Sequence, residues 1–455
     1  MKKITASLTS ISLVLFITAT AFGAPVTPKD PTNSSPVSVG APLTAQSPTP
    51  LNSYGAVDLN ANVPLSAQVI PKTSDFKDPV ITPLSSIFAQ SVPMAPSLNA
   101  KSYILMDATT GAVIAANNPN MRLAPASLTK LMLLYITEQE LAKNQIHLDD
   151  IVTVQPVAWA TGGSRMFLKP GDQVSVRDLI SGIIVASGND AAVTLALHIA
   201  GTQEAMVNMM NQQAIQLGMT NTHFSDVMGL PVPNHYSSAY DLALLARAIV
   251  TQYPQDISWY GQKWFTHNGI KQPNFNKLLF IYPYALGLKT GSTSSAGYSL
   301  VSAAQMPGRS MELVGVVLNT PSGDDSAADS KALLTYGFNF FTDLKIYSAG
   351  QVLDNPRVSF GQDKTSPVGP KDDINITIPT NLSSNLTANL KLQPNLQAPL
   401  VQNQTIGSID ISLSGTSASQ AGSANIIQSV PAVILKDNPK GNVLRRMNDQ
   451  VSSWF

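Results

Sequence analysis

Prolines are concentrated in one stretch of this chain. Thirteen of the 32 prolines lie between Ala24 and Ala100, separated mainly by Ser, Thr, Ala and Asn. Proline lacks a backbone N–H and its φ is fixed, so it interrupts both helices and sheet ladders. The apolar residues of this stretch also follow no sustained period. We therefore predict that residues 24–96 form a flexible, proline-rich tether and that the folded part of the chain begins near residue 97.

The first residues have the pattern of an export signal. Lys2 and Lys3 precede an apolar run from Ile11 to Phe22, whose end carries small residues at Ala19, Ala21, Gly23 and Ala24. A basic start, a short apolar run and small residues at the cleavage point are typical of a secretory signal peptide. The run is too short to span a bilayer comfortably. We expect residues 1–23 to be a signal peptide and the mature protein to be exported.

The composition excludes several classes of function. Lys+Arg and Asp+Glu each total 28, which gives a formal net charge of zero. Nucleic-acid binding requires a concentrated excess of positive charge, so no nucleic-acid partner is expected. The chain has no cysteine, which excludes a disulfide framework, a cysteine nucleophile and thiolate metal sites. Hydrophobic residues make up 44% of the chain, enough for a sizeable core.

Hydrophobic periodicity and capping signals predict the order of the elements. Expected strands lie at 102–106, 113–116, 285–290, 298–304 and 312–318, and expected helices lie at 128–142, after Ser175, after Ser238 and at 330–341. Strands on both sides of a run of helices predict an α+β domain over 97–345, with a helical cluster inserted between parts of an antiparallel sheet. Alternating segments such as 374–378 and 409–413 predict a small all-β domain over 346–437.

The first candidate for chemistry is Ser127-Leu-Thr-Lys130, which opens a helix just after Pro125. Residues three apart share a helix face, so a hydroxyl and an amine are held side by side. Lysine can remove the proton of serine only when it is neutral, and burial and a second nearby cation both lower its pKa. Alone, this pattern is also typical of a surface helix with an exposed lysine.

Two further motifs strengthen the interpretation. Ser187-Gly-Asn189 follows the apolar run Ile180–Ala186, and Lys289-Thr-Gly291 ends the predicted strand Ala285–Leu288. A trio of this kind, in this order on helix, loop and strand, is characteristic of active-site serine enzymes that react with penicillin. Each tripeptide is common by itself, whereas the ordered set is rarely a coincidence.

The chain resembles the low-molecular-mass penicillin-binding proteins that act as D-alanyl-D-alanine carboxypeptidases. The resemblance covers about residues 97–455 and rests on the blocks Pro125–Met132, Met166–Gly171, Ser187–Ala191, Gln272–Asn274, Leu286–Gly291 and Ala296–Leu300. It implies a penicillin-binding/β-lactamase-like transpeptidase domain, followed by the all-β domain and a short amphipathic tail. The proline-rich tether has no counterpart in the family.

The resemblance also implies roles for individual residues. Ser127 would be the nucleophile, Lys130 its general base, and Ser187 with Lys289 would relay a proton to the departing D-alanine. The substrate would be held by the side chains or backbone of Asn189, Lys289, Thr290, Gly291 and Ser292. The substrates would be peptidoglycan stem peptides, penicillins would remain attached as covalent inhibitors, and no metal or cofactor would be needed.

The sequence departs from the family where arginine helps to bind the terminal carboxylate. Some relatives carry that arginine at the position of Phe275, and others carry it within a stretch that corresponds to residues 322–330. Neither place has an arginine here. Lys289 and Thr290 are then the expected anchors of the substrate carboxylate.

Other functions fit the residues less well. A D,D-endopeptidase acting on cross-links and a non-catalytic peptidoglycan-binding protein are the alternatives that we retain. A class A β-lactamase would need a glutamate for deacylation, but Glu204 falls in a helical pattern only 15 residues after Asn189. Gly-x-Ser-x-Gly and His-Glu-x-x-His are both absent from the sequence, and the five histidines are scattered.

The C-terminal residues have an amphipathic pattern. At about 100° per residue, the apolar side chains of 442–455 fall within an arc of roughly 120°; they are Val443, Leu444, Met447, Val451, Trp454 and Phe455. Basic residues outnumber acidic ones over 436–449, which suits anionic lipid headgroups. We predict that 438–455 form a helix lying on a membrane surface, at the periplasmic face of the bacterial inner membrane. The alternative is a helix that packs on the β-domain.

Overall fold

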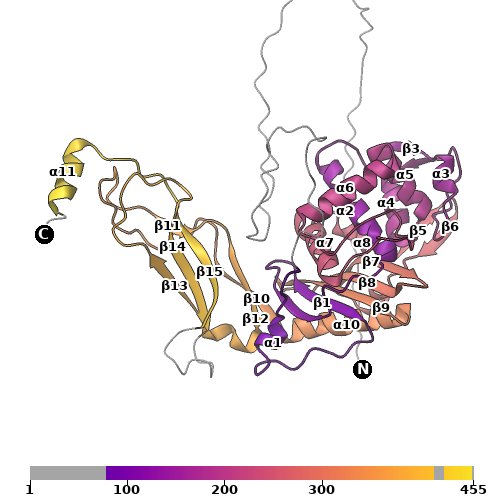
Figure 1. Ribbon diagram of the computed structural model, residues 1–455, viewed down its shortest axis with the longest axis horizontal. Helices are drawn as coiled ribbons and strands as arrows, with labels where there is room; N and C mark the ends of the chain where they lie inside the picture. The colour runs from indigo at the N-terminus through magenta and orange to yellow at the C-terminus, as the bar shows by residue number, and fades with distance from the viewer. Residues whose placement is uncertain (1–77, 414–424, 453–455) are drawn as a thin grey trace, which may run out of the picture. The chain divides into compact units, whose positions relative to one another are not determined.

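A five-stranded antiparallel sheet is the centre of the larger domain. The computed structural model describes residues 78–413 and 425–452. The sheet order is β2-β1-β9-β8-β7, so strands from both ends of the domain are neighbours (Figure 1). The strands are β1 (Ser102–Asp107), β2 (Val113–Asn117), β7 (Ala285–Thr293), β8 (Gly297–Gln305) and β9 (Glu312–Thr320). The predicted α+β class with an antiparallel sheet is confirmed.

Helices cover one face of this sheet (Figure 1). Alternate strand residues such as Ile104, Met106 and Val316 point into a core that is shared with the buried faces of these helices. The inserted elements are η3 (Ala126–Thr129), α2 (Lys130–Ala142), β3 (Ile151–Thr153), α3 (Pro156–Trp159), β4 (Gln173–Ser175), α4 (Val176–Val185), α5 (Asn189–Ala200), α6 (Gln203–Gln216), α7 (Ala239–Gln252), α8 (Ile257–Tyr260), β5 (Trp264–His267), β6 (Ile270–Pro273) and α9 (Leu278–Ile281).

The predicted caps form, while one predicted helix starts differently. The hydroxyls of Ser175 and Ser238 accept hydrogen bonds from the N–H groups three residues later, at 3.1 and 3.2 Å, as the capping pattern requires. The helix expected from 128 begins instead as the 3-10 turn η3, with α2 starting at Lys130. Ser127 therefore lies in a tighter turn, in which side chains three apart are eclipsed.

The opposite face of the sheet is covered by α10 (Gly323–Phe340) and by a segment that precedes the sheet. Leu105, Leu313 and Val317 point toward this side. The N-terminal segment, residues 78–100, includes α1 (Leu84–Ile87). Its Val92 is 7% exposed, and the hydroxyl of Tyr336 on α10 donates to Pro93 O at 2.7 Å. The C-terminal part of the predicted tether, residues 78–96, is thus packed on the domain, because its scattered apolar side chains fill this second core. Residues 24–77 of the predicted tether, and the predicted signal peptide, lie outside the described residues.

A second, all-β domain follows. Its elements are β10 (Phe341–Tyr347), β11 (Val368–Pro370), β12 (Ile374–Pro379), η4 (Thr380–Asn385), β13 (Leu386–Leu392), β14 (Thr405–Leu413) and β15 (Asn425–Ile434). Four of these strands form a sheet of order β11-β15-β14-β13, and β10 pairs with β12. The expected start at residue 346 falls inside β10, because β10 continues directly from α10.

The chain ends in α11 (Val443–Ser452). The carboxylate of Asp449 accepts from Phe360 N at 2.8 Å and is 5% exposed. Val443, Leu444 and Met447 are 60, 76 and 62% exposed. The helix therefore contacts the β-domain through a polar side chain, and these three apolar side chains face away from it. Within the described residues, no helix is both long and apolar enough to cross a bilayer.

Glu138 is an unusual member of the helical core. It lies on α2, is 2% exposed, and accepts a hydrogen bond from the Tyr260 hydroxyl at 2.8 Å. Burial raises the pKa of Glu138 to about 8, and the charge of Asp256 adds to the rise. The folded chain binds this proton more tightly than the unfolded chain does, so ionisation destabilises the fold as the pH rises from about 4.5 towards 8.

Glu138→Gln should therefore stabilise the fold at alkaline pH. Glutamine keeps the acceptor for Tyr260 and copies the protonated acid without a charge that can form. The difference in free energy of unfolding between variant and parent should grow from near zero at pH 5 to clearly stabilising at pH 9. Urea unfolding at several pH values measures it. If the free energies of unfolding of variant and parent change with pH in the same way, ionisation of Glu138 does not destabilise the fold and the prediction is wrong.

Candidate active site

The residues predicted to carry chemistry come from three continuous stretches of the larger domain, 127–130, 187–189 and 289–292. Ser127 lies in η3, Lys130 is the first residue of α2, Ser187 lies between α4 and α5, and Asn189 is the first residue of α5. The Lys289–Ser292 segment lies on β7, the edge strand of the sheet. Hydrogen bonds join these stretches. Lys130 contacts Ser187 and Asn189, and Ser187 contacts Lys289 on β7.

Lys130 is the hub of these contacts. Its Nζ lies 3.0 Å from Ser127 Oγ, 2.9 Å from the backbone oxygen of Ser187 and 2.6 Å from Asn189 Oδ1. Its exposed fraction is 0%. The amine is therefore held beside the hydroxyl of Ser127 by oxygen acceptors from other elements, within reach for a direct proton transfer.

A second hydroxyl connects the two lysines. Ser187 Oγ lies 3.4 Å from Lys130 Nζ and 3.0 Å from Lys289 Nζ. Lys289 Nζ also donates to Thr290 O at 3.0 Å. Ser127, Lys130, Ser187 and Lys289 thus form a continuous chain of groups that can exchange protons. The φ of Ser187 is 53°, a left-handed conformation that costs a non-glycine residue about 1–2 kcal/mol.

Burial and like charge favour the neutral forms of both lysines. Burial, followed by the nearby charge of Lys289, lowers the pKa of Lys130 well below its usual value, while Asp226 and Asp190 oppose this shift. Burial lowers the pKa of Lys289 to about 7. A neutral Lys130 at moderate pH is the state that a general base requires.

The segment after α3 forms a wall beside Asn189. Asn189 Nδ2 donates to Gly162 O at 2.6 Å. Next to it, the carboxylate of Asp190 accepts from the N–H groups of Met166 and Leu168 at 2.8 and 3.0 Å. These bonds fix the amide of Asn189, so that its Oδ1 faces Lys130.

Gly291 has a role that the sequence did not indicate. The family resemblance implied only that Gly291 helps to hold the substrate. A Cβ at this position would lie 2.8 Å from Pro125 O and 3.1 Å from Leu128 N. Glycine therefore allows β7 to lie directly against η3. This packing brings Lys289, on β7, close to Ser127, on η3. Ser292, the next residue, is exposed at the same end of β7.

The two positions at which relatives carry an arginine differ in their exposure to solvent in this fold. Phe275 is 50% exposed, between β6 and α9. Ser326 on α10 is 3% exposed, and its hydroxyl donates to Gly323 O at 3.0 Å. An arginine could be accommodated at 275 but not, without repacking, at 326. Lys289 and Thr290 remain the expected anchors of a carboxylate.

The sequence reasoning missed Thr129, Asp226 and His235. Thr129 Oγ1 lies 2.8 Å from His235 Nε2, and both residues are buried. His235 Nδ1 lies 3.5 Å from Asp226 Oδ2. No motif marks these residues, and the contacts join positions 106 residues apart, so only the fold could reveal them.

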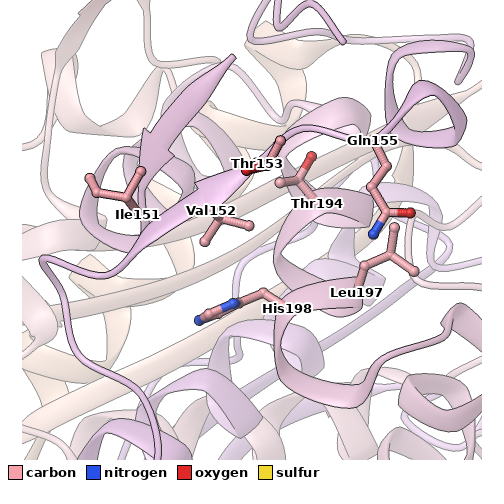
Figure 2. A pocket seen from close by; sticks show the side chains of 7 residues that line it. All are labelled: Ile151, Val152, Thr153, Gln155, Thr194, Leu197 and His198. Carbon is pink, nitrogen blue, oxygen red and sulfur yellow. The ribbon is translucent and has the colours of Figure 1, made fainter. Parts of the chain in front are cut away.

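A cavity of about 290 Å³ lies between β3 and α5 (Figure 2). Its lining combines Thr153, Gln155, Thr194 and His198 with the apolar side chains of Ile151, Val152 and Leu197. None of the predicted site residues lines it. The cavity is thus separate from the Ser127 cluster, although both use α5.

The sequence matches two family models. One, described as D-alanyl-D-alanine carboxypeptidase, covers residues 89–322, and the other, the C-terminal domain of penicillin-binding protein 5, covers residues 341–440. The chain belongs to the D-alanyl-D-alanine carboxypeptidase family. It is thereby a low-molecular-mass penicillin-binding protein, and the predicted serine-type carboxypeptidase is confirmed at this level.

Individual relatives agree with the family models. D-alanyl-D-alanine carboxypeptidase DacC of Escherichia coli is 39% identical over 383 residues, which are 81% of this chain and 93% of that protein. DacA of Haemophilus influenzae is 41% identical over 331 residues, 72% of this chain and 84% of that one. Penicillin-binding protein 5 of H. influenzae superposes with a TM-score of 0.72 at 39% identity, covering 76% of this chain and 99% of that chain. The carboxypeptidase thus has the predicted penicillin-binding fold.

Gly291→Ala should impair acylation by penicillin at least about tenfold. The added methyl would push β7 away from η3, and displacements of about 1 Å at a reacting pair are costly. The measurement is the second-order rate constant with a fluorescent penicillin. Gly323→Ala is the matched control, because the nearest atom to its new Cβ is 3.7 Å away. Equal rates for both variants would contradict the role of this close approach.

Proposed function

We propose that this carboxypeptidase removes the terminal D-alanine of peptidoglycan stem peptides through an acyl-enzyme on Ser127. The observation that carries the proposal is the 3.0 Å contact between Ser127 Oγ and the fully buried Lys130 Nζ. Neutral Lys130 takes the hydroxyl proton as Ser127 Oγ bonds to the carbonyl carbon of the penultimate D-alanine.

The leaving group requires a proton. As the C–N bond of the tetrahedral intermediate breaks, the proton that Lys130 took from Ser127 passes through Ser187, which contacts both lysines, to the amine of D-alanine. Water then attacks the ester while Lys130 accepts the proton of the water. Lys130 returns this proton to Ser127 Oγ as the ester bond breaks and the shortened peptide leaves. Backbone amides of Ser127 and Ser292 are the proposed oxyanion donors, each worth roughly 3–4 kcal/mol in a well-studied protease.

Substrate binding rests on β7 and Asn189. Lys289 and Thr290 would hold the terminal carboxylate, Asn189 would hold the acyl part of the stem peptide, and β7 offers an unpaired strand edge. Penicillin, which mimics the dipeptide, would acylate the same serine and stay attached. The absence of arginine at Phe275 leaves action on cross-links as the second candidate.

Incubation with a labelled penicillin, followed by mass analysis of the adduct, tests the nucleophile. Ser127→Ala should abolish both labelling and D-alanine release, because Ser127 Oγ lies closer to Lys130 Nζ than Ser187 Oγ does, at 3.0 Å against 3.4 Å. Assays on a pentapeptide and on a cross-linked dimer separate the two candidate activities. Labelling of Ser127→Ala at the parent rate would show that the nucleophile lies elsewhere, and wild-type protein that neither labels nor turns over would be a binding protein only.

Lys130→Arg tests the general base. Arginine keeps the positive charge but cannot lose its proton at accessible pH. Acylation should fall by at least about a thousandfold at every pH between 6 and 9, within the range that general base catalysis contributes. Lys143→Arg, on the exposed end of the same helix, should acylate normally. Near-parent rates for Lys130→Arg would refute the assignment.

We also propose that the protein is exported and bound peripherally to the periplasmic face of the inner membrane. The exposed side chains of Val443, Leu444 and Met447 support an interfacial helix, and the apolar pattern continues to Trp454 and Phe455, outside the described residues. The polar contact of Asp449 with Phe360 N argues against apolar packing of α11 on the β-domain. Interfacial helices bury one apolar face at the headgroup level.

Deletion of residues 442–455 should move active enzyme from the membrane fraction to the soluble fraction. The apolar face would be lost while the described contacts of the catalytic domain stay intact. Cell fractionation with penicillin labelling measures the distribution. Asp449→Asn in the full-length chain serves as the control, since it keeps the apolar face and should remain with membranes. Truncated enzyme that stays membrane-bound, or that no longer binds penicillin, would contradict the proposal.

A further inference from the structure

One carboxylate holds two stretches of a loop that lie against η3, the turn that carries Ser127. Asp226 lies in the loop between α6 and α7, where its Oδ1 accepts from Met228 N and Gly229 N, both at 2.6 Å. Its Oδ2 lies 3.5 Å from His235 Nδ1. Oδ2 also accepts from Leu230 N at 3.1 Å, so the carboxylate as a whole engages two different stretches of the loop. Each of these stretches contacts a residue of η3.

The first contact precedes Ser127. Gly229 has φ 88°, and a Cβ there would lie 1.7 Å from Ala126 O. The loop backbone, clamped by Asp226 Oδ1, therefore lies directly against the carbonyl of Ala126. Ala126 itself has φ 49°, an unfavourable conformation for alanine that persists only when the surroundings impose it. The clamped loop is one such surrounding.

The second contact follows Ser127. His235, whose side chain is 1% exposed, places Nε2 at 2.8 Å from Thr129 Oγ1. Thr129 is fully buried and directly precedes Lys130. With the ring proton on Nδ1 facing Asp226, the hydroxyl of Thr129 donates to Nε2. In the other tautomer, Ser225 N donates to Nδ1 at 3.4 Å, and Thr129 accepts, so the contact with η3 persists either way.

We propose that Asp226 and His235 are positioning residues that hold Ala126 and Thr129, and thereby set the distance between Ser127 Oγ and Lys130 Nζ. The proposal rests on the proposed roles of Ser127 and Lys130. It explains how a serine in a strained turn keeps contact with a buried lysine. Proton transfer in acylation depends on this geometry, which a rigid second contact on each side of Ser127 would preserve.

The same carboxylate contributes charge. Lys130 is faced by Lys289 from β7, Asp190 from α5 and Asp226 from the loop, among the charged groups of the described residues. Hydrogen bonds from His235 and from the backbone N–H groups outweigh the effect of burial and lower the pKa of Asp226, so this group is an anion at neutral pH. Removing its charge should make the neutral amine of Lys130 easier to form.

Two pairs of variants of the full-length enzyme test the proposal. Thr129→Val removes the hydroxyl at nearly constant shape, whereas Thr129→Ser restores it. Asp226→Asn keeps an oxygen for Met228 N and Gly229 N but loses the charge. The second-order rate of acylation by a fluorescent penicillin is measured from pH 5 to 10, together with the melting temperature. Asp150→Asn, in a partly exposed pairing with His147 and His198, is the matched control.

Thr129→Val should acylate at least about tenfold more slowly than the parent, and Thr129→Ser should recover most of the rate. In Asp226→Asn the acidic limb of the pH profile should move to lower pH, because Lys130 loses its proton more easily. Combining Thr129→Val with Asp226→Asn should cost less than the product of the single losses, since both act through His235. Asp150→Asn should match the parent.

Parent rates and an unmoved acidic limb in Thr129→Val and Asp226→Asn would overturn the proposal. The proposal would also be overturned if the acylation rate fell only in proportion to the melting temperature and Thr129→Ser did not restore it. Failure of the proposed function gives a different result, because the parent enzyme itself would then show no adduct on Ser127.

Discussion

Complete burial of an amine is the constraint on which this active site depends. Lys130 is 0% exposed, and its Nζ is satisfied by oxygens of Ser127, Ser187 and Asn189. Removing an ammonium from water is costly, so the neutral amine is favoured. Burial thus converts an ordinary lysine into a base. It requires that α2, α5 and the turn before α5 all pack around Lys130 Nζ.

The sheet supplies the remaining part of that enclosure. β7 is an edge strand, and Gly291 lets it lie against η3 at a separation that a side chain would prevent. Lys289 on the same strand brings a second buried amine to Ser187. Like charges at short range disfavour simultaneous protonation, so the packing of strand on turn and the state of the base are coupled. The close approach of β7 to η3 at Gly291 therefore serves both the packing of the sheet and the placement of Lys289 beside Ser187.

Motifs on single segments made most of the fold and the principal site residues predictable. Ser127, Lys130, Ser187, Asn189 and Lys289 lie in short patterns, and the capping residues Ser175 and Ser238 mark helix starts that the structure confirms. Other features depend on segments that are far apart in the chain. They are the close approach of Gly291 to η3, the contact of Asp226 with His235, and the contact of His235 with Thr129. Local periodicity carries no information on such contacts. The sequence left open whether the apolar residues within 78–96 dock on the domain, because proline content predicts the absence of regular structure and not the absence of contacts.

The N-terminal segment has a mechanical consequence. Asp78 Oδ1 accepts from Asn221 Nδ2 at 2.7 Å and Pro79 O accepts from Asn120 Nδ2 at 2.9 Å, well before the chain enters β1. A pull on the chain upstream of residue 78 therefore loads these side-chain bonds, and next the apolar contacts of Leu84 and Phe88, before any strand of the sheet. The first load thus falls on the segments around Asn221 and Asn120, and not on the sheet.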